Sequence, residues 1–508
     1  MRNFLIIAWI IIFGGLGFIA YKKFIPTEQG STIIIPTDDS ENILPSTEDS
    51  SDTTSENTSE TTSTYNPIAE QPPAIVTAKS FEDHVAAGDQ YLHDLLPASA
   101  IQEYKAALEL QPTDLPTNIK LAEAYLENGE SATAEQEFLK VSALNPESQN
   151  LKLGIARALL NQRQIKKAKE VVWQLDMTNY NVKYYAGVIL ILSKEFDEAK
   201  KLFTEIATTA PESYKILKQK TAKFIEKYDT FGLYAEGDPL FLQTMLAKAL
   251  VDNREYQSAI PLLFDVLNQK SNYRDAWTIL GYSYLQIKNS KEAIDALSQA
   301  RSLDPENPTV LFYLGMGYYS NNQISKAIDY IEEAGAKGFE PKSQINSKLG
   351  ELYLIRSNFS KAESNYSELL NANNNNIELY TKIVWLNIDK LKNPEKALQY
   401  AKLAIANLPE KAMSYNLTGW AYSAMKDNTN AEKNYQLALK IDPSIDSTYY
   451  NLGRLYEENG STAISKQYYQ KAYTLSSNKE LKEMALSHYN KLNTKETSID
   501  LEPLELTP

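Results

Sequence analysis

Few residues in this chain have the types and spacings that catalysis needs. The 508 residues contain three histidines, His84, His93 and His488, and no cysteine. No pair of histidines has the spacing of metal ligands on one helix face. Without cysteine the chain cannot build a thiolate nucleophile, a zinc ribbon or an iron–sulfur cluster. The phosphate-loop, H-E-x-x-H and G-x-S-x-G patterns do not occur. We therefore predict no catalytic residue, no metal and no cofactor.

Composition favours binding over reaction, and it limits what can be bound. The chain has 33 Tyr, 15 Phe and 5 Trp, and its formal net charge is −14. Aromatic side chains bury a large area and can still stack or donate a hydrogen bond, which suits a binding surface. Tracking phosphates along a nucleic acid requires clustered Lys and Arg, and no sustained basic stripe occurs. We therefore expect no nucleic-acid partner.

The elements that would position these aromatic residues repeat along the chain. Gly281 and Gly315 are 34 residues apart, and each is followed three residues later by Tyr and twelve residues later by Ala. The same residue types return in the sets Gly88, Tyr91, Ala100, Tyr104, Ala107; Gly419, Tyr422, Ala431, Tyr435, Ala438; and Leu452, Gly453, Tyr456, Ala472. Chance helices would not repeat small residues at fixed offsets.

The spacing within one unit predicts two helices. Gly281 and Tyr284 lie one turn apart on a first helix, while Ala293, Leu297 and Ala300 follow one face of a second. Small residues at these positions would let the paired backbones approach closely. Pro305 then ends the second helix, because proline lacks an N–H and clashes with the preceding turn.

These residues resemble the tetratricopeptide repeat (TPR), whose pattern is W-x2-L-G-x2-Y followed by A-x3-F/Y, a second Ala and Pro. The resemblance covers roughly residues 81–477. It implies an all-α fold, a right-handed TPR superhelix of about eleven helix-turn-helix repeats. Such arrays are scaffolds that bind a protein or peptide partner.

The register of the repeats suggests a domain organisation. We expect a transmembrane anchor at 1–26, a disordered Ser/Thr-rich acidic linker at 27–77, four repeats at 78–211, a connecting helix and loop at 212–239, seven repeats at 240–477, a capping helix at 478–492 and a disordered tail at 493–508. The cap is expected because a terminal repeat has no neighbour to cover its open face.

The N-terminal segment indicates a membrane. Residues 4–21 carry no charge and, as a helix, would cover most of a hydrocarbon core of about 30 Å. A cleavable signal peptide is the alternative, but the small residues Gly15 and Gly17 make a poor cleavage site. The polar linker and the missing cysteine favour repeats on the extracytoplasmic side, and the abundance of Asn, Lys, Ile and Tyr favours a bacterial-type protein.

A run of lysines marks the segment that interrupts the repeats. Lys215, Lys218, Lys220, Lys223 and Lys227 share the polar face of the predicted helix. An acidic partner or a membrane surface could contact them. A solvated face on a connecting helix is the simpler expectation.

The TPR resemblance also implies where a partner binds, because first-helix side chains line the concave face of such arrays. In the C-terminal block those positions are Tyr282, Gln286, Phe312, Met316, Tyr319, Asn416, Trp420, Tyr450 and Arg454. We interpret them as an aromatic concave groove. The alternative for each is packing between neighbouring repeats.

Comparison with the known classes of TPR protein excludes two functions. The Lys and Asn of carboxylate-clamp repeats are replaced here by Thr278 and Tyr282, and the asparagine ladder of glycosyltransferase-linked arrays is missing. We therefore predict a membrane-anchored scaffold that assembles a protein complex at the cell envelope. The alternative is binding of a glycan or other cell-wall polymer in the same groove, and an enzyme is the least favoured class.

Overall fold

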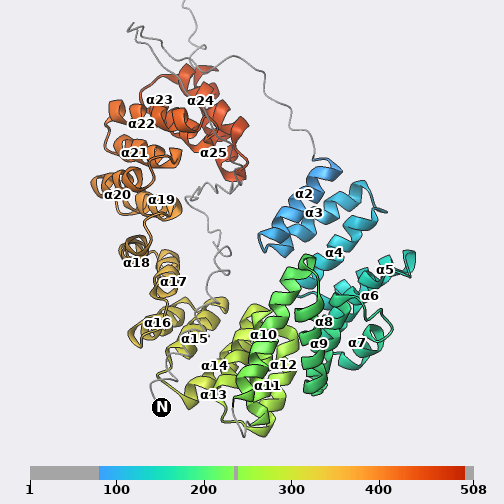
Figure 1. Ribbon diagram of the computed structural model, residues 1–508. Coiled ribbons are helices and arrows are strands. Elements are labelled where there is room, and N and C mark those ends of the chain that lie inside the picture. The colour runs from blue at the N-terminus through green and yellow to red at the C-terminus, as the bar shows by residue number, and fades with distance from the viewer. Residues whose placement is uncertain (1–78, 234–237, 498–508) are drawn as a thin grey trace, which may run out of the picture. The chain divides into compact units, whose positions relative to one another are not determined.

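The computed structural model describes residues 79–233 and 238–497. In this part of the chain every regular element is a helix and no strand occurs (Figure 1). Contacts between helices divide the described chain into two units, which separate between Arg356 and Ser357.

The first unit contains the helices up to α17. They are α2 (Phe81–His93), α3 (Pro97–Leu110), α4 (Leu115–Glu127), α5 (Ser131–Leu144), α6 (Gln149–Asn161), α7 (Ile165–Val172), α8 (Tyr180–Leu192), α9 (Phe196–Thr209), the 3-10 helix η1 (Glu212–Tyr214), α10 (Lys215–Gly232), α11 (Pro239–Asp252), α12 (Tyr256–Gln269), α13 (Arg274–Gln286), α14 (Ser290–Leu303), α15 (Pro308–Ser320), α16 (Ile324–Ala336) and α17 (Lys342–Ile355).

The second unit contains the remaining helices. They are α18 (Phe359–Ala372), α19 (Ile377–Trp385) with its π-helical extension η2 (Leu386–Lys390), α20 (Pro394–Asn407), α21 (Ala412–Ala424), α22 (Asn428–Ile441), α23 (Asp446–Glu458), α24 (Thr462–Leu475) and α25 (Lys479–Thr497).

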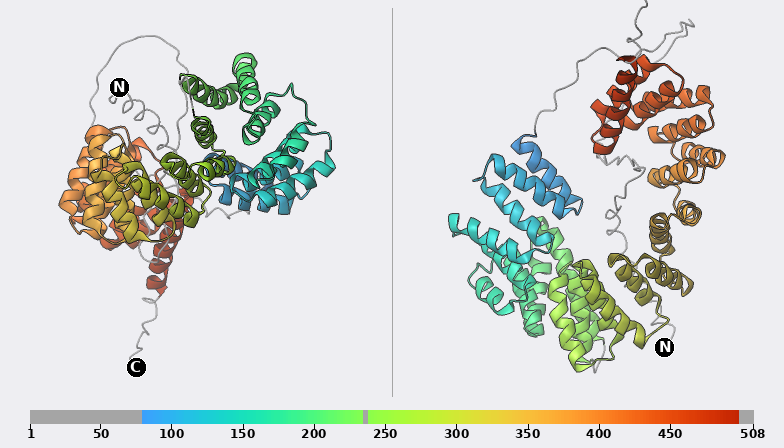
Figure 2. Two further views of the ribbon diagram at one scale, coloured as in Figure 1. Left: turned by 90° about the horizontal axis from the view of Figure 1, so that it is seen from below. Right: turned by 180° about the vertical axis from the view of Figure 1, so that it is seen from behind.

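Consecutive helices form hairpins (Figures 1 and 2). Four pairs precede α10, and three pairs, α11 to α16, follow it in the first unit; the second unit contains three more, α19 to α24. The all-α repeat architecture predicted from the sequence is therefore confirmed. The interruption after the fourth pair contains the predicted extra helix, α10, and α25 packs on α24 at the end of the array.

Small residues bring the two helices of a hairpin together, as the sequence predicted. A Cβ atom on Gly281 would lie only 2.4 Å from Cγ of Leu297 on the partner helix. Gly453 has the same relation to Tyr469, where a Cβ atom would lie 2.7 Å from the ring. Glycine is required at these positions because any larger residue would separate the helices.

Each hairpin turn contains one residue in the left-handed region of backbone space. These residues are Leu95, Gly129, Arg163, Lys194, Arg254, Lys288, Asn322, Ser357, Lys392, Lys426 and Gly460. Only two of them are glycine, although this conformation normally favours glycine.

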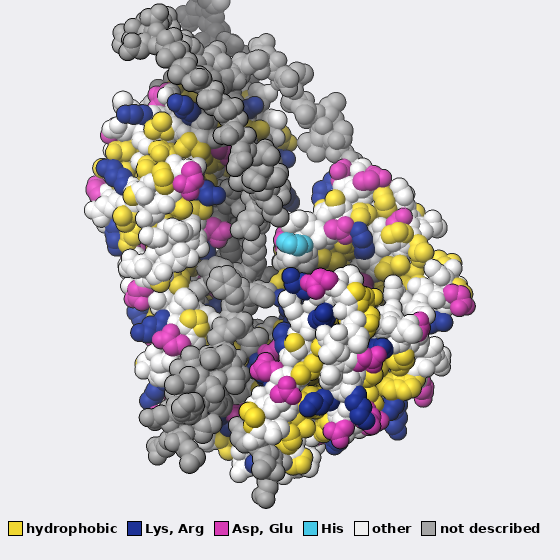
Figure 3. Space-filling view, in the orientation of Figure 1, with side chains coloured by type: hydrophobic (Ala, Val, Ile, Leu, Met, Phe, Trp, Pro, Cys, Tyr) yellow, Lys and Arg dark blue, Asp and Glu magenta, His cyan; other side chains and the backbone are white. Residues whose placement is uncertain are grey.

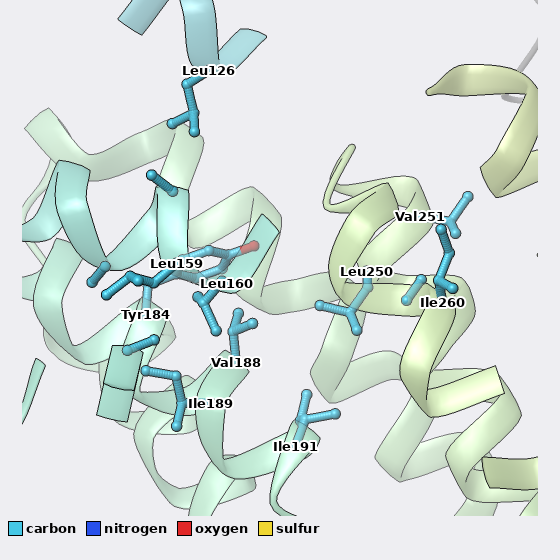
Figure 4. Close-up of a cluster of buried hydrophobic side chains, with 14 of the residues drawn as sticks. Leu126, Leu159, Leu160, Tyr184, Val188, Ile189, Ile191, Leu250, Val251 and Ile260 are labelled. Carbon is cyan, nitrogen blue, oxygen red and sulfur yellow. The ribbon is translucent and has the colours of Figure 1, made fainter. Parts of the chain in front are cut away.

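The first unit also contains contacts between repeats that are not neighbours. Helix α12 packs against α6 and α8, well before it in the chain, while α10 packs on α8, α9 and α11. Figure 4 shows a cluster of buried side chains in this core, among them Leu159, Leu160, Tyr184 and Val188. The extra helix therefore belongs to one continuous core.

The predicted transmembrane segment lies outside the described residues, as do the linker and the residues after 497. No helix among the described residues has the length and apolar character needed to cross a membrane. Helix α25 continues beyond the expected end of the cap at 492.

Candidate partner-binding site

The predicted groove residues of the first unit lie on α13 and α15. They are Tyr282, Met316 and Tyr319, which are half-buried, Gln286, which is exposed, and Phe312, which is buried. The Phe312 ring stacks on Phe339 with a centroid distance of 4.2 Å, so most of its surface is used in packing. Lys348 Nζ lies 4.8 Å from the centroid of the Tyr319 ring, in a cation–π contact.

Three tyrosines from neighbouring helices form what we call the tyrosine face: Tyr256, Tyr282 and Tyr313. The Tyr282 ring lies 4.9 Å from Tyr313 and 6.3 Å from Tyr256, measured between centroids. All three side chains keep part of their surface in contact with solvent. Burial raises the pKa of each phenol, so the hydroxyls remain protonated and can donate hydrogen bonds at neutral pH.

The predicted residues of the second unit lie on α21 and α23. Asn416 is buried and accepts a hydrogen bond from Asn451 Nδ2 at 3.0 Å. Tyr450 is also buried, and its ring meets His488 edge-on at 5.8 Å. Trp420 is half-buried and Arg454 is exposed. The last two therefore have more surface to offer a partner than the first two.

Arg454 faces an acidic residue that the sequence did not indicate. Asp389, in the π-helical extension of α19, is half-buried, and burial raises its pKa although the positive charge of Arg454 opposes the rise. Arg454 is also 3.9 Å from Glu458 on its own helix. Arg454 therefore pairs with one carboxylate and acts electrostatically on a second.

Each of the three histidines pairs with a carboxylate. The Nδ1 atoms of His84, His93 and His488 lie 2.7, 3.2 and 2.8 Å from Glu103, Asp94 and Glu457, respectively. No group of potential metal ligands of metal-binding size occurs among the described residues.

The first unit holds a charged cluster that the sequence analysis missed. We call it the Arg157 cluster: Glu123 and Glu127 on α4, Arg157 on α6, Tyr185 on α8, Lys220 on α10 and Glu255 just before α12. Arg157 Nη1 donates to both carboxylate oxygens of Glu123, at 2.9 and 2.7 Å. Its Nη2 lies 3.6 Å from Glu127, and the guanidinium group lies 5.7 Å from the centroid of the Tyr185 ring.

Glu255 is the least well paired acid of the cluster. Lys220 Nζ is 3.8 Å from its carboxylate, which is beyond hydrogen-bond distance. Burial raises the pKa of Glu255, while Lys220, Arg157 and the Tyr185 hydroxyl act in the opposite direction. Its side chain nevertheless retains 16% of its exposure, so solvent reaches it.

The lysines of α10 do not form a solvated face, and that expectation is wrong for three of them. Lys223 Nζ donates to the carbonyl of Asp252 at 2.6 Å, and Lys220 lies over the Tyr184 ring at 5.4 Å. Lys227 is buried and pairs with Glu226 at 2.8 Å. On the face shown in Figure 3, basic and acidic side chains are interspersed over the first unit.

One signal in the sequence would have revealed part of the Arg157 cluster. Tyr282 and Gln286 follow Gly281 by one and five residues. Glu123 and Glu127 follow Ala122 at the same distances, and Arg157 follows Ala156 by one residue, so these three occupy lining positions. These charges are complementary on successive first helices. Glu255 could not be found in this way, since it lies in a hairpin turn and reaches the cluster only because α12 packs on α6 and α8.

Comparison with known families identifies the repeat. Models described as tetratricopeptide repeat match residues 103–136, 244–308, 289–341, 412–445 and 446–479. A TPR repeat-containing protein of Methanocaldococcus jannaschii is 22% identical over 443 residues, which cover 75% of this chain and 73% of that protein. The peroxisomal targeting signal receptor of Candida albicans is 22% identical over 40% of this chain and 36% of its own length.

Solved structures also align with the chain, with TM-scores below 0.5. The yeast Tom70 structure aligns with 83% of this chain and 97% of its own, at 15% sequence identity and a TM-score of 0.31. The C-terminal part of a TPR repeat-containing protein from Cytophaga hutchinsonii aligns with 48% of this chain and 98% of its own, at 15% identity and a TM-score of 0.40.

Proposed function

We propose that this chain, which matches tetratricopeptide repeat models over five stretches, is a scaffold that binds a polypeptide partner and assembles a complex. Repeats of this kind expose long rows of first-helix side chains, each row continued by the next repeat. A relative that is 22% identical over 40% of this chain is named a peroxisomal targeting signal receptor.

The tyrosine face is the observation that carries this proposal. Tyr256, Tyr282 and Tyr313 lie on consecutive repeats and present partly exposed rings with protonated hydroxyls. Tyrosine is enriched at binding hot spots because it combines a large apolar area with one hydrogen-bonding group. The partner would lie across these rings and continue toward Met316 and Tyr319.

The second unit contributes Trp420 and Arg454 in the same role. Both side chains keep exposed surface, and tryptophan and arginine are enriched at hot spots. Phe312, Asn416 and Tyr450 are buried, so their side chains contribute to packing within their own units.

The proposal places the scaffold at the cell envelope, with residues 4–21 as a single transmembrane anchor and the repeats extracytoplasmic. Its support is the uncharged apolar sequence of that segment. In cell fractionation the full chain should sediment with membranes, and a chain lacking residues 1–26 should not. If the full chain and the shortened chain were found in the same fractions, the proposed membrane anchor would be refuted.

Site-specific photocrosslinking in cells tests the binding surface. A photoreactive residue in place of Tyr282 or Trp420 should capture a defined protein. The same residue in place of Leu139, an exposed residue on a second helix, should not. Trp420→Ala should reduce capture through position 282 if one partner spans both units. Capture of cell-wall glycan instead of protein would favour the alternative function, and equal capture from all three positions would refute the groove.

A further inference from the structure

Buried polar atoms beside Glu255 lack hydrogen-bond partners. Tyr184 is 1% exposed and Asn253 is 4% exposed, and neither the Tyr184 hydroxyl nor Asn253 Oδ1 has a partner within hydrogen-bond distance, although the Asn253 side chain lies near enough to the hydroxyl to oppose the rise that burial causes in the pKa of Tyr184. Asn253 Nδ2 is already used, since it donates to the carbonyl of Lys220 at 3.0 Å. An unsatisfied buried polar atom costs about 1–3 kcal/mol, so several at one place indicate a missing ligand.

The unused capacity is mainly acceptor capacity. Asn253 Oδ1 can only accept, the Glu255 carboxylate has no hydrogen bond from Lys220, and the Tyr184 hydroxyl can accept as well as donate. A ligand that satisfies all three must bring several N–H donors to one point. A primary ammonium or a guanidinium group has this property.

The charges of the Arg157 cluster agree with a cationic ligand. Its carboxylates are Glu123, Glu127 and Glu255, and its cations are Arg157 and Lys220, which leaves one negative charge unbalanced. Arg157 cannot serve as the missing donor because Glu123 and Glu127 already engage its guanidinium group.

Glu255 lies beside the tyrosine face. Glu255 and Tyr256 are adjacent in the chain, and the Tyr256 ring lies 6.3 Å from Tyr282. Both Glu255 and Arg157 keep some solvent exposure, 16% and 24% of their side chains. A polypeptide on the tyrosine face could therefore insert one side chain here.

We propose that Glu255, Asn253, Tyr184 and Tyr185 form a pocket for one lysine or arginine side chain of the polypeptide bound on the tyrosine face. The pocket deepens the proposed scaffold function and rests on it, since it specifies the chemistry of the partner. Because Lys220 and Arg157 already lie over the rings of Tyr184 and Tyr185, at 5.4 and 5.7 Å, the attraction for the ligand would come from the oxygen acceptors.

A random peptide library selected on the full chain tests the pocket. Selected peptides should share one position occupied by lysine or arginine. Replacing that residue by glutamine in a synthetic peptide should weaken binding about tenfold, the loss expected for one charge-assisted hydrogen bond. Glu255→Gln should weaken binding to a similar degree. In this variant the glutamine substitution in the peptide should have little further effect, because both changes remove the same interaction.

Two controls separate this pocket from general attraction to an acidic protein. Glu198→Gln removes one charge from an exposed side chain on α9, and it should leave peptide binding unchanged. Tyr185→Phe keeps the ring and removes only the hydroxyl, and it should weaken the lysine peptide more than its glutamine counterpart. Glu255→Gln should not lower the thermal stability, since it removes a desolvated charge.

The outcomes distinguish the pocket from the scaffold function. Peptides that need Tyr282 but show no lysine or arginine preference would overturn the pocket and leave the scaffold. Equal losses from Glu198→Gln and Glu255→Gln would also overturn it. If no peptide binds to the folded chain, both proposals fail.

Discussion

Buried tyrosines in the two units differ in what their hydroxyl groups contact. In the second unit, Tyr469 fills the space opposite Gly453 and donates to Glu457 at 2.7 Å. In the first unit, Tyr184 is equally buried but its hydroxyl has no partner. A satisfied hydroxyl helps to hold α23, α24 and α25 together, whereas an unsatisfied one leaves capacity for a ligand. The same residue type therefore has a structural role in one repeat and a binding role in another.

Substitutions that leave a cavity in the core should have the largest effect on the stability of either unit. Phe203→Ala removes a buried ring that stacks on Phe224 at 4.3 Å, and Tyr435→Ala removes the ring opposite Gly419. Each should cost about 3–5 kcal/mol. Because α10 packs on both α9 and α11, Phe203→Ala should also reduce the hydrogen-exchange protection of α12. Tyr435→Ala should reduce protection only in the helices next to Tyr435. Hydrogen exchange measures both, and full protection of α12 in Phe203→Ala would contradict the first.

Removing a single hydroxyl should affect the two units in opposite directions. Tyr469→Phe leaves Glu457 without its 2.7 Å donor and should destabilise the second unit by about 1–2 kcal/mol. Tyr184→Phe removes an unsatisfied buried group and should be neutral or stabilising by up to about 1 kcal/mol in the absence of a ligand. Denaturant unfolding gives both values. A clear destabilisation by Tyr184→Phe would show that the hydroxyl has a partner in the free protein.

Acidification should also affect the stability of the two units differently. Burial raises the pKa of Glu255, so its neutral form favours the fold below the ordinary value of about 4.3 and this contribution is lost as pH rises through the folded pKa. Burial acts the same way on Glu457, but donation by Tyr469 and His488 outweighs it and lowers the pKa. Its contribution is present above the ordinary value and is lost as pH falls through the folded pKa.

Hydrogen exchange between pH 7 and pH 3 tests this contrast, after correction for the intrinsic rates. Protection at the start of α12 should rise on acidification, and protection of α25 should fall. Glu255→Gln and Glu457→Gln serve as matched variants that should each remove the pH dependence of one region only. The same trend in both regions would contradict the opposite pKa shifts.

The comparison also explains what could be predicted from the sequence. Glycines such as Gly281 and alanines such as Ala293 predict hairpins because they determine the contact between adjacent helices, and the structure has these hairpins. Glu255 and Tyr184 come together through α12 packing on α6 and α8, a contact that no repeat pattern encodes. Lys220 and Lys223 of α10 were misjudged for the same reason, since their partners are Glu255, in the turn after α11, and the carbonyl of Asp252 in α11.

Substitutions in the hairpin turns should have the smallest effect on stability. In these turns the two units have different residues in the same left-handed backbone conformation. Lys288 in the first unit has φ of 64° and Gly460 in the second has φ of 78°. A side chain costs about 1–2 kcal/mol in this region, while glycine loses more entropy on folding, so the two terms partly cancel. Lys288→Gly should therefore stabilise the first unit by only about 0.5 kcal/mol, and Gly460→Lys should destabilise the second by a similar amount. Parallel denaturant titrations against each parent chain measure this difference, and a change of more than about 2 kcal/mol would mean that the turn residue also makes a contact that its neighbours depend on.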